Sequence, residues 1–435
     1  MNKIPDDGVA VHCSKPSPWV CHYTLSLLTV IYALNYLDRN IFSIVLQSIK
    51  EDLLLSDTAL GLLGGLVFAL FYATLGIPIA WLADRYSRRN IITIGLSVWS
   101  LMTVLTGMVT NLWQLAVTRF LMGAGEACGN PPSNSMVADL YGKDRRSTAL
   151  SILISGSTIG VFLGYLLGGW INEFYGWRVV YFVAGLPGLC IALLFWLTVK
   201  EPRRGAAETG KPSLSVSSFR ETMLFFARSK TYLFVVIGGC MMAVHIFGNG
   251  IWYPAFLQRV HGLESGEIGT YLAMSRGPIG VLGIFTGGWL ADRLGRRDER
   301  WRVWVPAYGC LLAAPAELVF LCSDTLWVAI TGMIAAGFFT AVHGGPIFAI
   351  VLAVAKVRMR AMATAIFLLC GNIIGQTLGP LGIGYLNDVL TPSLGGLAIR
   401  YSLLLGPVSG VLAFILIGMG SRYVVRDIRH ATASD

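Results

Sequence analysis

Five charged side chains lie inside long apolar stretches of the chain, where a charge is costly. They are Asp38, Arg39, Arg119, Glu126 and Arg276. A charge at the centre of a bilayer costs about 2.5–3.5 kcal/mol even on insertion scales, so each of these residues requires a reason. Acids and bases buried together can bind a charged group and exchange protons, and the five residue types suggest that chemistry.

The spacing of these residues predicts how they meet. Arg119 and Glu126 are seven positions apart, which is two helical turns, so both should line one cavity wall. The rise of a helix places Asp38 and Arg119 at similar depth in the outer part of the membrane, where they could face each other. Burial favours the neutral form of Glu126 whereas Arg119 favours the charged form, which suits a proton carrier. The alternative is an ion-pair network that only fixes helix register.

The second half of the chain predicts a different wall. Aligning Leu112 with Leu326 places Met333 opposite Arg119 and Thr340 opposite Glu126, so the polar wall should belong to the first half. Aromatic and histidine side chains of the second half are by default packing residues, but together they could form an apolar wall suited to an amphiphile. The residues expected to line this cavity are Asn35, Tyr36, His245, Asn249, Trp252, Tyr253, Arg276, Phe338 and His343.

The elements that position these residues are apolar segments. Of the 435 residues, 55% are hydrophobic and 13% are charged, against about 25% charged in an average soluble domain. A membrane span needs about 20 helical residues, and the bilayer core offers no partner for an open strand edge. We therefore predict an all-α membrane protein with twelve transmembrane helices, six on each side of a polar linker. The predicted spans are 22–47, 58–82, 90–109, 112–138, 147–171, 178–199, 231–257, 266–290, 302–321, 325–353, 361–386 and 400–421.

A repeated charge block indicates that the two halves are homologous. Residues 80–89 and 288–297 both contain Leu-Ala-Asp-Arg followed by Arg-Arg, and each block closes an apolar stretch. Duplicated halves are a common framework for secondary transporters. The aspartates could pair with the arginines or with a helix N-terminus and so latch one side shut. The expected gating residues are Asp84, Arg85, Arg88, Arg89, Asp139, Arg145, Asp292, Arg293, Arg296 and Arg297.

Glycines form a second repeat. Gly156, Gly160 and Gly164 recur in one span, and Gly371, Gly375 and Gly379 recur in the matching span of the second half. Such a stripe lets a neighbouring helix approach closely. It serves either static packing or a smooth face on which one half moves against the other.

The distribution of charge sets the expected topology. The net charge is +9, and most lysines and arginines fall in the loops that share one side with both termini, which predicts cytoplasmic termini. We expect no cleaved signal peptide, and the cysteines do not have metal-type CxxC spacing. We expect a multi-pass protein of a bacterial inner membrane. The expected parts are a tail 1–20, a six-helix half 21–200, a linker 201–230 that includes an amphipathic helix, a six-helix half 231–423 and a tail 424–435.

The charge block resembles the loop signature of the major facilitator superfamily, with Ala80 in place of the usual first glycine. Four further segments are similar to its Spinster branch, which includes sphingosine-1-phosphate and lysophospholipid transporters. These are Asn35-Tyr36-Leu37-Asp38-Arg39, Leu53-x-Leu55-Ser56-Asp57, Gly123-x-Gly125-Glu126-Ala127 and Gly176-Trp177-Arg178. The resemblance implies that Asp38, Arg39, Arg119 and Glu126 are the substrate and proton-coupling residues.

Our first functional hypothesis is a secondary active transporter that moves a lipid-like anion by alternating access, coupled to protons. The second is a proton-coupled carrier of a small organic anion such as a carboxylate or sugar acid, and the third is a receptor or scaffold with an inactive transporter core. The sequence has no phosphate-binding GxxxxGK[ST] loop and no nucleophile elbow, so we expect no enzyme and no cofactor. The expected partners are membrane lipids, an amphipathic or anionic small molecule and protons, with no nucleic acid, and we expect a monomer.

Overall fold

The described chain is built from helices. A computed structural model describes residues 17–202 and 219–433, and all regular structure within those ranges is helical. The expected tail 1–20 and linker 201–230 lie largely outside the described residues. The first group of helices comprises α1 (Pro18–Ile44), α2 (Leu46–Leu53), α3 (Asp57–Gly64), α4 (Leu66–Arg85), α5 (Arg88–Thr106), α6 (Leu112–Glu126), α7 (Asn130–Leu140), α8 (Lys143–Tyr175) and α9 (Trp177–Thr198).

The second group follows the polar linker. It comprises α10 (Phe219–Arg228), α11 (Lys230–His261), α12 (Ser265–Arg276), α13 (Pro278–Gly295), α14 (Trp301–Cys322), α15 (Leu326–Ala353), α16 (Arg360–Leu394), α17 (Ala398–Ser402), α18 (Leu405–Gly420) and α19 (Val424–Ala433), with 3₁₀ turns at Val357–Met359 and Gly395–Leu397. Within the described residues, 8 helical segments are long and apolar enough to cross a membrane.

Five of the predicted spans are interrupted, two of them close to one end, namely 22–47 at Val45 and 400–421 at Leu403 and Leu404, and three in their interior. The stretch 58–82 divides into α3 and α4 at Gly65, and 266–290 divides into α12 and α13 at Gly277. The stretch 112–138 divides into α6 and α7 around Gly129. The breaks at Gly65 and Gly277 fall at matching places in the two groups. Ser56 begins α3 by accepting a hydrogen bond from the Ala59 amide.

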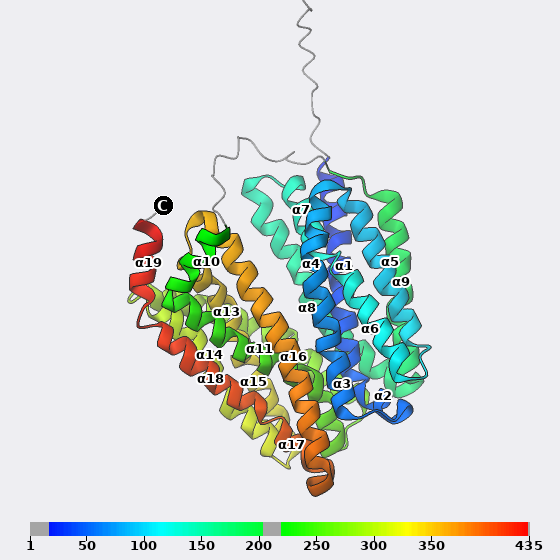
Figure 1. The fold of residues 1–435 in the computed structure, drawn as a ribbon. Helices are drawn as coiled ribbons and strands as arrows, with labels where there is room; N and C mark the ends of the chain where they lie inside the picture. The colour runs from blue at the N-terminus through cyan, green and yellow to red at the C-terminus, as the bar shows by residue number, and fades with distance from the viewer. Residues whose placement is uncertain (1–16, 203–218, 434–435) are drawn as a thin grey trace, which may run out of the picture.

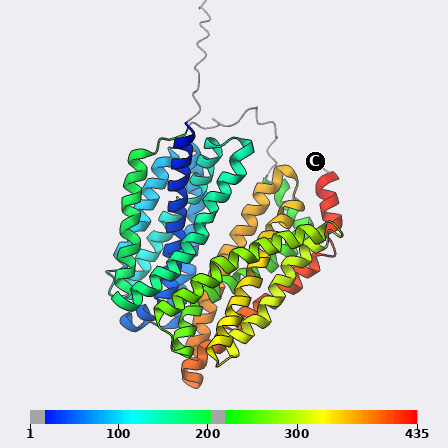
Figure 2. The same cartoon turned by 180° about the vertical axis from the view of Figure 1, so that it is seen from behind.

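The two groups of helices meet at one end of the molecule and separate toward the other (Figures 1 and 2). We call the end where α1 begins and α19 lies the terminal end, and the opposite end, near α2 and α17, the far end. At the far end one core contains residues of both groups, including Phe42, Trp177, Trp252 and Phe320. Toward the terminal end each group has its own core. The groups are therefore held together mainly at the far end.

Close helix crossings join the groups at the far end. A Cβ on Gly61 would collide with the Pro380 carbonyl of α16, so α3 and α16 touch backbone to backbone. A Cβ on Gly269 of α12 would lie 3.1 Å from the Cα of Gly169 in α8. Only glycine permits these two approaches, because any side chain would push the helices apart.

The predicted glycine stripes pack within each group. Gly156, Gly160 and Gly164 of α8 face the backbone of α1, which belongs to the same group. Gly375 and Gly379 of α16 face α11 in the same way. The stripes therefore hold neighbouring helices of one group together, and the alternative of a sliding face between the groups is wrong.

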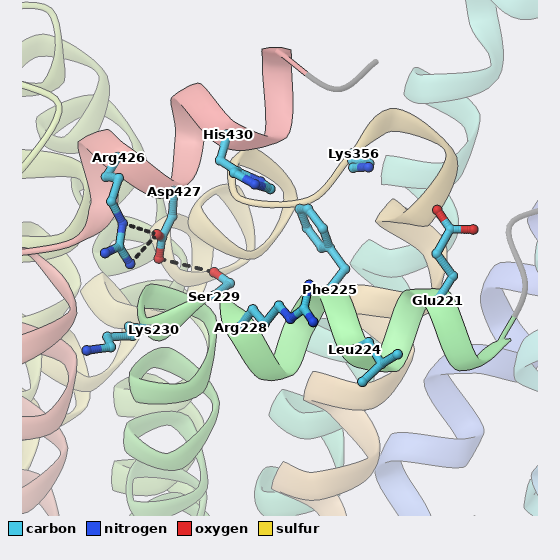
Figure 3. A pocket seen from close by; sticks show the side chains of 10 residues that line it. All are labelled: Glu221, Leu224, Phe225, Arg228, Ser229, Lys230, Lys356, Arg426, Asp427 and His430. Atoms are coloured by element: carbon cyan, nitrogen blue, oxygen red, sulfur yellow. Dashed lines mark hydrogen bonds and ion pairs between the residues drawn. The ribbon is translucent and has the colours of Figure 1, made fainter.

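Two short helices lie outside the main bundle at the terminal end. The helix expected within the linker is α10, and it lies beside α19 around an open pocket of about 580 Å³ (Figure 3). Asp427 of α19 accepts hydrogen bonds from the Ser229 hydroxyl, at 3.2 Å, and from the Thr231 amide, at 2.9 Å. Asp427 therefore fixes α19 to the beginning of α11.

Candidate functional site

A buried ion pair joins α1 to α6 in the first group. Arg39 Nε donates to Glu126 Oε2 at 2.7 Å, and the Glu126 side chain is fully buried. Tyr36, one turn before Arg39, presents its ring 5.4 Å from the Arg39 guanidinium. Asn35 lies beside Glu126 on the same side of α1. Glu126 Oε1 has no hydrogen-bond partner among the described residues. Glu126 is thus paired directly with Arg39 and also interacts with Arg119 and Asn35.

Asp38 and Arg119 lie next to this pair. The Asp38 carboxylate accepts a hydrogen bond from the Thr103 hydroxyl at 3.1 Å, and Asp38 interacts electrostatically with both Glu126 and Arg119. The Arg119 guanidinium lies 4.1 Å from the centroid of the Phe42 ring. The structure therefore brings the four predicted charges together. The direct pair is Arg39–Glu126, whereas the sequence suggested a contact between Asp38 and Arg119.

These charges border a pocket between the two groups of helices. The pocket has a volume of about 230 Å³ and receives Tyr36, Arg39 and Arg119 from the first group. The second group contributes Arg276 and two amides, Asn372 and Gln376. These polar groups stand beside apolar side chains of the same group, namely Ile246, Phe247 and Ile251. Asn372 and Gln376 lie one turn apart in α16, and their mutual hydrogen bond of 2.7 Å places both on the pocket side.

A second pocket of about 320 Å³ adjoins the first and shares Arg276 with it. Its walls are mostly apolar, with Leu272, Val281, Ile284 and Met333 among them. Four of the predicted lining residues border it, namely His245, Asn249, Tyr253 and Arg276.

Three other predicted lining residues lie away from both pockets. Trp252 is fully buried and donates its indole N–H to the Pro380 carbonyl at 2.9 Å. Phe338 packs against Ala291 and Val342. His343 is buried with its Nδ1 3.4 Å from the Cys310 sulfur. These three side chains pack between helices, which was the default interpretation of the sequence.

Sequence reasoning missed a buried acid in the second group. Glu317 of α14 is fully buried, and its Oε1 accepts a hydrogen bond from the Tyr253 hydroxyl at 2.8 Å and another from the Asn249 amide. Its Oε2 lies 3.2 Å from His245 Nδ1. Glu317 falls within the predicted span 302–321, so the rule that identified Asp38 and Glu126 would also have identified it.

Polar contacts close the far end between the groups. Arg259 of α11 binds Asp57 of α3 through two nitrogens, at 2.6 and 2.9 Å, and Lys50 adds a third contact at 2.7 Å. Asp388 of α16 accepts hydrogen bonds from the Asp57 and Thr58 amides at 3.0 and 2.7 Å. Burial alone would raise the pKa of the Asp57 carboxyl, but Arg259 and Lys50 outweigh it and lower that pKa. We call the contacts of Asp57 with Arg259 and Lys50 the latch, and its aspartate is charged at neutral pH.

The predicted gating residues behave differently in the two groups. Arg88 is buried and binds Asp139 of α7, and its Nε donates to Glu201 at 2.8 Å. These contacts stay within the first group. Hydrogen bonds from the Arg89 amide, Arg88 and Ser87 lower the pKa of Glu201 despite its burial.

The remaining gating residues lie on the surface. Asp292 is exposed and makes no hydrogen bond or ion pair with the described residues. Arg85 and Arg293 each stack on a tryptophan one turn away, and the side chain of Asp84 lies outside the described part of the structure. The other predicted gating residues also have exposed side chains, namely Arg145, Arg296 and Arg297.

The described residues offer no arrangement suited to a metal. Within residues 17–202 and 219–433, no three histidine, cysteine, aspartate or glutamate side chains gather closely enough to hold a metal ion. The buried arginines have the chemistry to bind an anion, and the buried carboxyl groups have the chemistry to exchange protons.

Comparisons with known proteins agree with this geometry. The model of the Major Facilitator Superfamily matches residues 28–380. An MFS-type efflux pump of Mycolicibacterium smegmatis is 31% identical over 91% of both chains. Protein spinster homolog 1 of Xenopus tropicalis is 31% identical over 83% of this chain and 72% of its own length.

The solved structures include a bacterial homolog of the human lysosomal transporter Spinster. Its inward-facing, unoccupied conformation is 29% identical, covers 94% of this chain and 99% of its own, and superposes with a TM-score of 0.88. The inward-facing, occupied conformation superposes with a TM-score of 0.79.

Proposed function

The chain belongs to the major facilitator superfamily and is a Spinster-like membrane transporter rather than an enzyme, and on that premise we propose that it moves an amphipathic anion in exchange or symport with protons. The observation that supports this most is the Arg39–Glu126 pair beside a pocket that lies between two groups of helices. A carboxyl paired with an arginine can bind a proton when that arginine turns to an anionic substrate.

The proposed topology has twelve spans in two halves, with the terminal end in the cytoplasm of a bacterial cell. On this reading α3 with α4, α6 with α7, and α12 with α13 each cross the membrane as one broken span, and α17 with α18 forms the last. The far end then faces outward and is closed by Asp57 and Arg259, so the described conformation opens to the cytoplasm. Alternating access requires that this latch break while contacts form at the terminal end.

The two adjoining pockets support an amphiphile over a small polar anion. Arg39 and Arg119 border the smaller pocket and suit a phosphate or carboxylate head group. The larger pocket offers Val281, Ile284 and Met333, which suit an alkyl chain. A small organic anion would use the arginines and leave the second pocket to water.

The test is uptake by proteoliposomes under an imposed pH gradient. The probes are alkyl phosphates of eight to fourteen carbons, with lactate and gluconate as small anions, and protein-free liposomes correct for partition into lipid. We expect half-saturating concentrations to fall about fourfold per added CH₂, because each buried CH₂ contributes about 0.8 kcal/mol. A flat response to chain length together with uptake of lactate or gluconate would replace the amphiphile by a small anion. No pH-dependent uptake of any probe would contradict proton-coupled transport.

A further inference from the structure

The second group of helices contains a buried acid in direct contact with a histidine. Glu317 and His245 are both buried, and 3.2 Å separates Glu317 Oε2 from His245 Nδ1. Among the described residues no arginine or lysine lies within 4.0 Å of Glu317. The nearest charge is Arg276, whose guanidinium lies 5.7 Å from the centroid of the Tyr253 ring. Glu317 therefore makes no ion pair with an arginine or lysine in this conformation, and its basic neighbour in direct contact is His245.

The contacts around the pair are compatible with a proton on Glu317, and His245 also forms a hydrogen bond with the Gly406 backbone. Tyr253 and Asn249 both donate to Glu317 Oε1, so Oε2 is the oxygen left for a proton. On the other side of the ring, His245 Nε2 lies 3.3 Å from the Thr340 hydroxyl, where a neutral imidazole can donate. A carboxylic acid that donates from Oε2 to Nδ1 satisfies this geometry without any buried charge.

The charge balance favours the same state. When the two groups share one proton, the pair has no net charge. Without that proton a buried carboxylate remains, and with a second proton a buried imidazolium remains. The other titratable groups that face the pair are Tyr253, Arg276 and His343, which itself contacts Cys310. Arg276 is the one among them that can neutralise a carboxylate, since it borders both pockets and lies beside Tyr253.

The pair also communicates with the cavity. His245, Asn249 and Tyr253 border the larger pocket, and Glu317 lies directly behind them. A proton can therefore pass between the cavity and Glu317 through His245 without any movement of the backbone.

We propose that Glu317 and His245 form a second proton-binding site, separate from Glu126, in which Arg276 replaces the departing proton. The proton on Glu317 Oε2 passes through His245 to water in the cavity, and the carboxylate that remains attracts the Arg276 guanidinium. An anionic substrate that holds Arg276 keeps this site protonated. Only this last step rests on the proposed transport function, because proton binding itself needs no substrate.

The test is infrared difference spectroscopy of the full-length purified protein at neutral pH, in H₂O and D₂O. We expect a C=O stretching band of a protonated carboxyl that is lost in Glu317→Gln and retained in Glu126→Gln. In Tyr253→Phe the band should persist and move to higher frequency, because the C=O oxygen loses one hydrogen bond. This variant keeps the test decisive if Glu317→Gln does not fold. A spectrum in which neither variant changes a protonated-carboxyl band would overturn the proposal.

The role of Arg276 is tested by the pH at which the same band disappears. In Arg276→Ala the band should persist to a pH at least one unit higher than in wild type, because no cation then replaces the proton. Arg293→Ala is the matched control, since Arg293 is exposed and stacks on Trp289, and it should leave the titration unchanged. Equal titrations in Arg276→Ala and wild type would remove Arg276 from the site. These infrared measurements do not measure transport, so their outcome does not depend on the result of the uptake experiments.

Discussion

Replacement of Asp57 by asparagine should open the far end. The Asp57 side chain is 1% exposed and makes three charged contacts of 2.6–2.9 Å, two with Arg259 across the groups and one with Lys50. Asparagine keeps the shape of the side chain but removes the charge, so Lys50 and Arg259 lose their carboxylate partner, although Arg259 keeps its hydrogen bond to Gln47. Breaking a buried pair costs about 3–5 kcal/mol, and partial exposure of the two cations places this one near the lower limit. A change of about 3 kcal/mol corresponds to roughly a 150-fold shift toward the outward-open state.

The assay is the distance between spin labels across the far end. Cysteines at Glu51 of α2 and Ser393 of α16, both exposed, carry the labels in a background without native cysteines. Asp57→Asn should add a population at longer distance. Asp52→Asn is the matched control, because Asp52 pairs with Arg178 at 2.5 Å on the surface and within one group. If Asp57→Asn gives the same distances as Asp52→Asn and wild type, the latch does not hold the groups together.

Four further predictions concern Asp57, Arg88, Gly160 and Arg119. Because Arg259 and Lys50 lower the pKa of Asp57 below its usual 3.8, the latch is complete above that pH and is lost as the pH falls through the lowered pKa, so wild-type label distances should not change between pH 5 and 8. Arg88→Ala should lower the free energy of unfolding by about 3–5 kcal/mol, and Arg89→Ala by under about 1 kcal/mol, as measured by denaturation in detergent. Gly160→Ala should cost about 1–3 kcal/mol against the Ala33 backbone, whereas Gly288→Ala in α13, where an added Cβ meets no atom within 4 Å, should cost nothing. Arg119→Lys should weaken binding of tetradecyl phosphate, measured by calorimetry, while its melting temperature stays near wild type, since lysine keeps the charge and loses the bidentate geometry; equal affinity would show that charge alone is recognised.

Much of the fold could be predicted from the sequence because the bilayer imposes simple rules. Apolar length predicts helices, and the cost of a buried charge identified Asp38, Arg39, Arg119 and Glu126. The helix breaks at Gly65 and Gly277 could not be predicted, because a glycine in an apolar helix is as compatible with close packing as with a bend.

The contacts between segments distant in the sequence were less predictable. The partner of Glu126 depends on which face of α1 turns toward α6. Asp38 and Arg39 are adjacent in the sequence and point in different directions, so a small rotation of α1 decides that Arg39 contacts Glu126. The Asp57–Arg259 latch joins residues 202 positions apart, and periodicity carries no information on such pairs. The glycine stripes were correctly found, but only the packing shows that they face helices of their own group.

The central claim is that Glu126 carries a proton that drives transport. The most direct test compares two modes in proteoliposomes that contain Glu126→Gln, with tetradecyl phosphate as the probe. Glutamine cannot release a proton, so accumulation driven by a pH gradient should be lost, whereas counterflow, which needs no net proton movement, should continue. Gradient-driven accumulation at the wild-type level in this variant would contradict the claim.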